Sequence, residues 1–144
     1  MPPRQKTAVV AAGGNSLIID EQHKSIPDQY AAAATTSHHI ADMIEGGWDV
    51  VITHGKGPQV GFILRRSEMA IEEVPPVPMD YAGADTQGAI GYIFQRAMHN
   101  ELRRRSIDRN AIAVVTQIEV DRNDPAFEDP SKPIGSYMDE AFAK

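Results

Sequence analysis

Three short apolar runs stand out along the chain, at residues 7–12, 48–53 and 111–116. Each run is continuous rather than alternating, which is typical of a strand covered on both faces in a parallel sheet. The first two runs end abruptly in glycine-rich loops, so these strands are expected to stop there. The hydrophobic pattern therefore predicts three buried parallel strands.

A first helix is expected between the first two runs. Ser25 precedes Pro27 and Asp28, and this combination favours a helix start because proline and an acid both suit the first turn. Apolar residues then recur at helical spacing as far as Ile44, and Gly46-Gly47 is expected to end the helix. The order strand, helix, strand predicts a right-handed crossover in a parallel sheet.

Two further helices are expected after the second strand, over residues 59–73 and 80–105. The prolines of residues 74–78 cannot lie inside a helix, so that segment is read as an extended connector. The first half of the longer helix contains Gly83, Gly88 and Gly91. Each glycine weakens a helix, so close packing or a break is expected there.

Strands that alternate with helices predict an α/β fold with helices on both faces of the sheet. The tail from Asp121 onward has three prolines, many acids and no clear period, and is expected to be rich in loops. Three strands make a thin sheet, which indicates part of a larger one. The residues alone therefore predict a lobe rather than a whole sheet.

The composition excludes several classes of protein and partner, but it does not indicate a particular function. The 144 residues suggest one domain, and 42% hydrophobic with 24% charged residues is an ordinary globular composition. A formal net charge of -6 argues against nucleic acid or an anionic membrane as the main partner. The chain has no cysteine, which excludes disulfides and thiolate chemistry. Neither a signal peptide nor a membrane-spanning stretch is recognised, so the cytoplasm is the expected location.

Two glycine loops carry the candidate chemistry, Gly13-Gly14-Asn15 and Gly55-Lys56-Gly57. Ligands of parallel α/β sheets bind beyond the carboxyl ends of the strands, where glycine lets backbone N–H groups approach an anion. Together the loops could form one anion pocket, although each could also be a plain turn. Neither loop matches the dinucleotide fingerprint, and Gly57 follows Lys56 where a P-loop needs serine or threonine.

Several stretches, taken together, resemble carbamate kinases of the amino acid kinase family. They are Gly13-Gly14-Asn15, residues 53–61, 78–84, 87–88, 90–92 and 100–103, Thr116-Gln117, residues 123–127 and Lys132-Pro133-Ile134-Gly135. Their order and spacing agree with the family across nearly the whole chain.

The resemblance implies a three-layer αβα sandwich with a mainly parallel sheet, of which this chain is the amino-terminal lobe. It implies reversible phosphoryl transfer between ATP and carbamate, giving carbamoyl phosphate and ADP, with magnesium accompanying the nucleotide. The implied partners are the small anionic substrate and either a second copy in a homodimer or a complementing nucleotide-binding half. Residues 1–120 are then expected to form the acceptor-binding lobe, and residues 121–144 the start of a protruding subdomain.

The resemblance also assigns roles to individual residues. The substrate-binding residues are expected to be Gly13, Gly14, Asn15, Gly55, Lys56 and Gly57. Lys132 of the Lys-Pro-x-Gly motif is the expected catalytic residue, reaching the transferring phosphoryl group. Phosphoryl transfer needs positioning and charge neutralisation more than covalent chemistry, and backbone amides with lysines can supply both. No metal ligands are expected, because the acids do not have the spacing of a calcium loop.

Three departures from the family pattern stand out. Lys56 occupies a position where the family usually has asparagine, so it adds a mobile positive charge or indicates a different acceptor. Ala12 replaces a common leucine, which is read as a packing change. Family members are also considerably longer, and the nucleotide pocket is expected to lie in the part that this chain lacks.

Plainer interpretations stay open for several residues. Lys132 could be a solvated loop lysine, Asn15 could brace its turn, and His54 is better read as a structural hydrogen-bonding residue. The arginines of residues 103–105 are expected to be a solvated helix end that favours the helix dipole. For the whole chain, the alternatives are a non-catalytic anion-binding or regulatory module, and a fragment that exposes apolar surface along an unpaired sheet edge.

Overall fold

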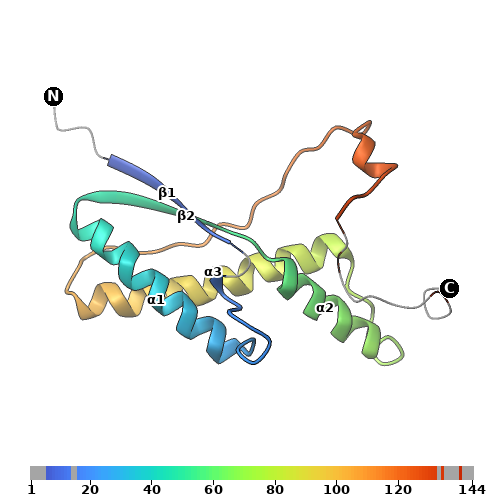
Figure 1. Ribbon diagram of the computed structural model, residues 1–144, viewed down its shortest axis with the longest axis horizontal. Coiled ribbons are helices and arrows are strands. Elements are labelled where there is room, and N and C mark those ends of the chain that lie inside the picture. The colour runs from blue at the N-terminus through green and yellow to red at the C-terminus, as the bar shows by residue number, and fades with distance from the viewer. Residues whose placement is uncertain (1–5, 14–15, 133, 135–139, 141–144) are drawn as a thin grey trace. The chain divides into compact units, whose positions relative to one another are not determined.

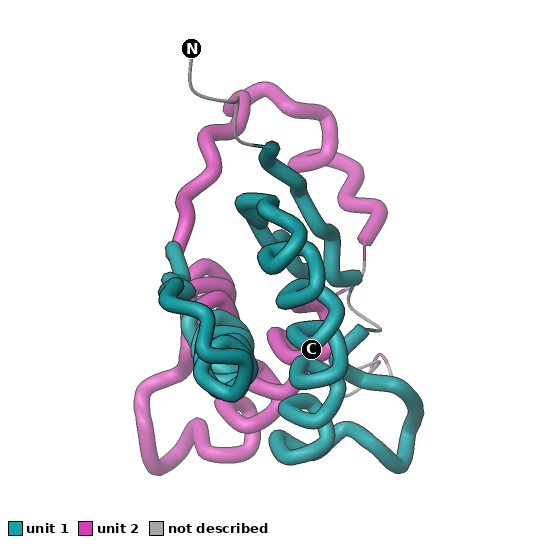
Figure 2. The backbone as a smooth tube through the Cα atoms, turned by 90° about the vertical axis from the view of Figure 1, so that its left-hand side faces the viewer, with its two compact units in different colours: residues 1–55, 88–114 teal, residues 56–87, 115–144 magenta. Residues whose placement is uncertain are grey.

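The computed structural model describes residues 6–13, 16–132, 134 and 140 (Figure 1). The elements are β1 (Lys6–Ala12), α1 (Ile26–Glu45), β2 (Trp48–His54), α2 (Gly57–Met69), α3 (Met79–Arg104) and a 3-10 turn, η2 (Pro125–Phe127). They fall into two compact units: unit 1 comprises residues 1–55 and 88–114, and unit 2 comprises residues 56–87 and 115–144 (Figure 2). No helix within the described ranges is long and apolar enough to span a membrane.

The two strands of unit 1 pair in parallel, as their continuous apolar runs predicted. One face of this sheet packs against α1 and the second half of α3. The cluster there consists of Ile40, Met98 and Leu102, with Val10, Ile44, Val50, Ile52, Ile107 and Ala111 packed against it. On the opposite face, Val9 and Val51 lie side by side in the register and are 69% and 50% exposed. The helices of unit 1 therefore cover the face that carries Val10 and Ile52.

Helix α1 begins and ends where the sequence predicted. The hydroxyl of Ser25 accepts the Asp28 N–H at 3.3 Å, and the Asp28 carboxylate accepts the Ser25 N–H at 3.0 Å, which makes a reciprocal capping box. At the other end, Gly46 caps the helix and Gly47 has a φ of 83°. Glycine adopts this left-handed conformation without steric cost, so the chain can turn directly into β2.

Helix α3 is continuous over 26 residues, so its glycines do not break it. The predicted close packing is confirmed at Gly91, where an added Cβ would lie 2.6 Å from the Cβ of Ala113. The side chain of Gln95 also donates to the Ala111 carbonyl at 3.1 Å. These two contacts hold the chain that follows the helix against its second half, within unit 1.

Residues 111–116 do not form the predicted third strand. In unit 2, the Gln87 side chain accepts the Thr116 N–H at 2.7 Å and donates to the Thr116 carbonyl at 3.3 Å. Ile112 and Val114 are 81% and 69% exposed. β-Branched residues favour a strand, but a strand also needs a neighbouring backbone for its ladder. Here glutamine side chains of α3 take some of the backbone bonds, and the described residues provide no strand beside the segment.

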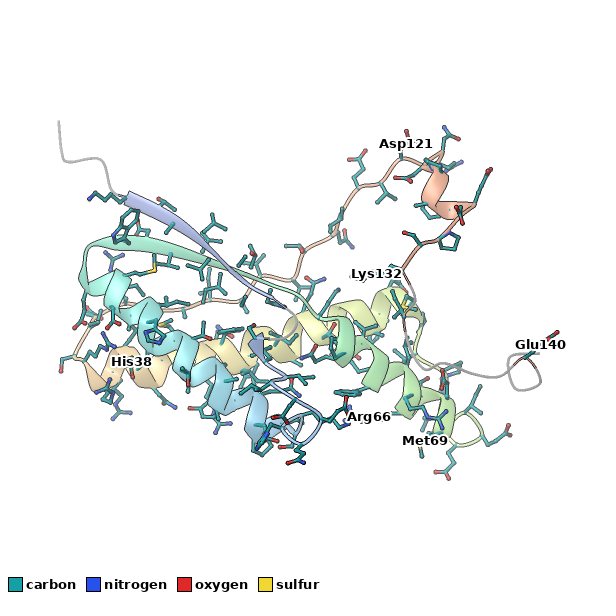
Figure 3. The ribbon with its side chains drawn as sticks, viewed as in Figure 1. His38, Arg66, Met69, Asp121, Lys132 and Glu140 are labelled. Atoms are coloured by element: carbon teal, nitrogen blue, oxygen red, sulfur yellow. The ribbon has the colours of Figure 1, made fainter. Side chains whose placement is uncertain are left out.

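Arg105 joins the ends of α1 and α3 in unit 1. It donates to the carboxylates of Asp42, Glu45 and Glu101 at 2.7, 2.5 and 2.7 Å. It also donates to the backbone carbonyl of His38, a residue of α1 (Figure 3), at 2.9 Å. The Arg105 side chain is only 10% exposed, so the expectation of a solvated helix end is wrong for this residue. The acids, Asp42 foremost, raise the pKa of Arg105.

Glu101 is the acidic centre of the same cluster. Arg104 donates to it at 2.6 and 3.0 Å, and the ring of His38 lies 2.9 Å from its carboxylate. Hydrogen bonds from Arg104 first, and then from His38 and Arg105, lower the pKa of Glu101 to about 2. The carboxylate therefore stays ionised well into the acid range.

Candidate functional site

The first glycine loop starts at the carboxyl end of β1. Ala12 and Leu17, on either side of the loop, are both buried and belong to the same core cluster of unit 1. The carbonyl of Gly13 accepts both the N–H and the hydroxyl of Ser16, at 2.9 and 2.5 Å. Gly13 itself is exposed, and an added Cβ would meet nothing within 4 Å. The predicted residues Gly14 and Asn15 lie outside the described residues.

The second loop starts beside the first. Ala12 lies opposite His54 in the register of the two parallel strands. One residue further on, the Gly55 N–H donates to the Ala12 carbonyl at 3.1 Å. The structure therefore brings Gly13 and Gly55 to the same end of the sheet, which is the end where parallel sheets bind their ligands.

His54 braces the end of β2. Its ring stacks on the ring of Phe94, with centroids 6.4 Å apart and an interplanar angle of 26°. Its Nδ1 lies 3.3 Å from the Gly55 carbonyl oxygen, which it reaches as a donor in the tautomer that carries the proton there. Both contacts are local to unit 1 and hold the chain just before the second glycine loop.

The rest of the second loop belongs to unit 2, where it begins helix α2. The Lys56 carbonyl accepts the Val60 N–H at 3.0 Å, and Gln59 and Val60 are buried. The start of α2 has no side-chain cap and no acid in its first turn. Its N-terminal end therefore keeps the positive potential of a helix dipole, next to the predicted substrate-binding residue Gly57.

The Lys56 side chain is not the mobile charge that the sequence predicted. Its ammonium donates to the Gly83 carbonyl of α3 at 2.9 Å, and the residue is partly buried. The same carbonyl accepts the Thr86 hydroxyl at 2.9 Å. Sequence reasoning did not connect Gly83 and Thr86 with the second loop. The only signal was Gly83 within a family motif, which gave no partner for it.

Lys132, the predicted catalytic lysine, lies in the described tail of unit 2, after the turn η2 (Figure 3). It is exposed to solvent. Pro133 and Gly135, the next fixed positions of its motif, lie outside the described residues. The assignments of Lys132 and of the glycine-loop residues stay predictions. In the parts of the chain that the structure describes, no three histidine or acidic side chains gather to hold a metal ion.

No family model matches the chain, but individual proteins do. A carbamate kinase of Pyrococcus horikoshii is 49% identical over 111 residues, which cover 76% of this chain and 35% of that protein. The carbamate kinase-like protein YahI of Escherichia coli is 45% identical over 139 residues, covering 95% of this chain and 44% of that protein. The chain thus spans less than half the length of these curated relatives.

Comparison of the fold with solved structures also leads to carbamate kinases. A solved structure of the carbamate kinase from Giardia lamblia, bound to AMP-PNP, superposes with a TM-score of 0.90 and is 35% identical. The match covers 96% of this chain and 44% of that one. The predicted fold class is therefore confirmed: this is a parallel α/β protein of the kind that carbamate kinases form. By sequence and by structure, the chain is similar to carbamate kinases and corresponds to their amino-terminal part.

Proposed function

We propose that this chain is the acceptor-binding lobe of a carbamate kinase-like phosphotransferase. Residues 1–120 form that lobe in this proposal, and residues 121–144 begin a subdomain that carries Lys132 towards the transferring group. The two glycine loops hold carbamate or carbamoyl phosphate. ATP or ADP with magnesium is the second substrate and binds a nucleotide-binding half outside these residues, and the expected assembly is a homodimer or a complex with that complementing half.

The observation that carries the proposal is the hydrogen bond between the Gly55 N–H and the Ala12 carbonyl. It places the starts of both glycine loops at one end of a parallel sheet, where such folds bind ligands. Carbamate kinases and a carbamate kinase-like protein share this part of the chain at 45–49% identity. Geometry and relatives thus support the same acceptor site.

The chemistry suits these residues. One oxygen of carbamate attacks the γ-phosphorus of ATP, the bond to the β,γ-bridging oxygen breaks, and ADP leaves. The attacking oxygen already carries negative charge, so the step needs no general base. The enzyme's task is to align the two oxygens and to neutralise charge on the phosphoryl oxygens. In the proposal, the loop amides and the Lys132 ammonium perform that task.

The test is ATP formation from carbamoyl phosphate, ADP and magnesium by the purified chain supplied with the nucleotide-binding half of a carbamate kinase. ATP should form, and the Lys132→Ala variant should lose about a hundredfold in kcat, the scale typical of removing one group that stabilises transition-state charge. Lys24→Ala is the matched control, because Lys24 pairs with Glu21 in the loop before α1. Circular dichroism should show the same fold for all three proteins. Equal rates in the unmodified chain and Lys132→Ala would remove Lys132 from the catalytic role.

A non-catalytic anion-binding or regulatory module is the second candidate. One observation favours it: a relative that matches 95% of the chain is named carbamate kinase-like. Calorimetric titration with carbamoyl phosphate separates the two functions. Binding without ATP formation, from a folded chain to which the nucleotide-binding half has been supplied, would support the module instead of the enzyme.

A further inference from the structure

We propose that Lys56 is a positioning residue, which fixes the start of helix α2 by holding the Gly83 carbonyl of α3 instead of offering its charge to a bound anion. Its effect on the acceptor rests on the proposed function above. The tether itself is a property of unit 2 alone and can be tested without turnover.

The tether is a charge-assisted hydrogen bond. The Lys56 ammonium donates to the Gly83 carbonyl at 2.9 Å, across 27 residues of sequence. Thr86, which is only 1% exposed, donates its hydroxyl to the same carbonyl at 2.9 Å and to the Ala82 carbonyl at 3.0 Å. The acceptor is therefore held in place by its own helix, and an ammonium bonded to it gains a fixed partner.

Position 83 is adapted to the lysine. A Cβ built on Gly83 would lie 3.0 Å from the Lys56 Nζ, a tight contact from which the ammonium would have to move by a few tenths of an ångström. At Gly88, further along the same helix, an added Cβ would meet nothing within 4 Å. An alanine at position 83 would therefore lengthen the bond from the ammonium to the carbonyl while leaving the lysine charge in the molecule. An alanine at position 88 adds the same methyl group without that consequence.

The tether acts on the second loop because Lys56 is also the residue from which α2 begins. Its carbonyl accepts the Val60 N–H at 3.0 Å, the first bond of that helix, and no side chain caps the start. Holding the Lys56 side chain on α3 thus holds the first turn of α2, including the predicted substrate-binding Gly57. Where the family usually has a short asparagine, this chain reaches across to α3 with a long ammonium side chain.

A double-mutant cycle tests the proposal with the full chain: unmodified protein, Lys56→Met, Gly83→Ala and the double variant. The first readout is the hydrogen-exchange rate of the Val60 amide, which NMR measures in the absence of ligand. Each single substitution should speed exchange several-fold by releasing the first turn of α2. The double variant should add little more, because both substitutions remove the same contact. Unchanged exchange in Lys56→Met, which removes the ammonium altogether, would overturn the proposal.

The second readout is the KM for carbamoyl phosphate and the kcat of ATP formation. A positioning role predicts that both single variants raise KM several-fold by similar factors, and that the double variant raises it no further. A lysine that binds the anion directly predicts a large rise for Lys56→Met alone. In that case Gly83→Ala, which loosens the hold on the ammonium, would leave KM unchanged or lower it, and the proposal would fail.

Two matched controls belong to the cycle. Gly88→Ala repeats the glycine-to-alanine change in the same helix, and Lys24→Met repeats the loss of a lysine in the loop before α1. Neither should alter Val60 exchange or KM. If the unmodified chain makes no ATP even with the nucleotide-binding half supplied, the proposed function fails by itself. The exchange measurements would still decide whether Lys56 holds α2 on α3.

Discussion

At the scale of single residues, the sequence did not predict the partners of the long charged side chains. Lys56 was expected to be a mobile charge near the acceptor, and the arginines of residues 103–105 a solvated helix end. The structure gives Lys56 a backbone carbonyl as its partner and Arg105 three carboxylates. Long charged side chains can reach partners that are distant in sequence, and their reach leaves no local pattern. The close packing at Gly91 was more predictable. A glycine weakens a helix, so its presence there indicated either a break or a close approach of another segment.

At the residue scale, Glu101 predicts a pH dependence of stability. Its pKa is about 4.5 in the unfolded chain and about 2 in the folded one. Because the folded value is the lower one, the stabilisation is complete above pH 4.5 and is lost as the pH falls towards 2. Glu101→Gln should therefore be less stable than the unmodified chain at pH 7. That difference should shrink between pH 5 and pH 2 in urea unfolding.

Glu68→Gln is the control for this series, since Glu68 forms an exposed pair with Arg65 at 3.2 Å. Such surface pairs contribute little, so Glu68→Gln should follow the unmodified chain at every pH. A Glu101→Gln variant with a constant deficit from pH 7 to pH 2 would show that the carboxylate charge is not what stabilises the cluster.

At the element scale, local signals decided the helices. The capping box at Ser25 and the glycines after Glu45 mark the ends of α1 in the sequence and in the structure alike. Helix α2 was expected over residues 59–73 but runs over Gly57–Met69, because Pro58 fits its first turn and the chain turns away after Met69. A helix end without a capping side chain has a weaker sequence signal, so its position is harder to predict.

The capping box carries a prediction for α1. Ser25→Ala removes the hydroxyl that accepts the Asp28 N–H, and should lower the free energy of unfolding by about 1 kcal/mol. Urea unfolding at neutral pH measures this change. Thr35→Ala is the control, because its exposed hydroxyl only bonds back to the Ala31 carbonyl in the middle of the helix. A loss for Thr35→Ala as large as that for Ser25→Ala would mean that the cap itself contributes nothing.

At the scale of the whole molecule, many large apolar side chains face solvent. They include Ile112, Val114, Ile118 and Val120, which are 81%, 69%, 83% and 62% exposed. This segment has the apolar composition of a buried strand, but no strand of the described residues lies beside it. Exposed apolar surface along an unpaired sheet edge was the expected mark of a fragment, and apolar surface of this kind promotes association.

The exposed segment predicts concentration-dependent association. Replacing both Ile112 and Ile118 by lysine should lower the light scattering of concentrated solutions and the fluorescence of an apolar dye. Glu119→Gln is the control, because it also raises the net charge within the same segment but removes no apolar side chain. If Glu119→Gln lowers both signals as much as the double variant does, net charge rather than apolar surface controls association.

The sequence by itself determined the two parallel strands, the three helices and the neighbouring glycine loops, because apolar period, capping residues and glycine pairs act over short distances. Its family motifs also led to the carbamate kinases. Only the tertiary structure decided that residues 111–116 lie beside the side chains of α3 instead of in a ladder, that Arg105 is partly buried among acids, and that Lys56 holds Gly83. Each of these outcomes depends on groups that are distant in the sequence and come within hydrogen-bonding distance only in the folded chain.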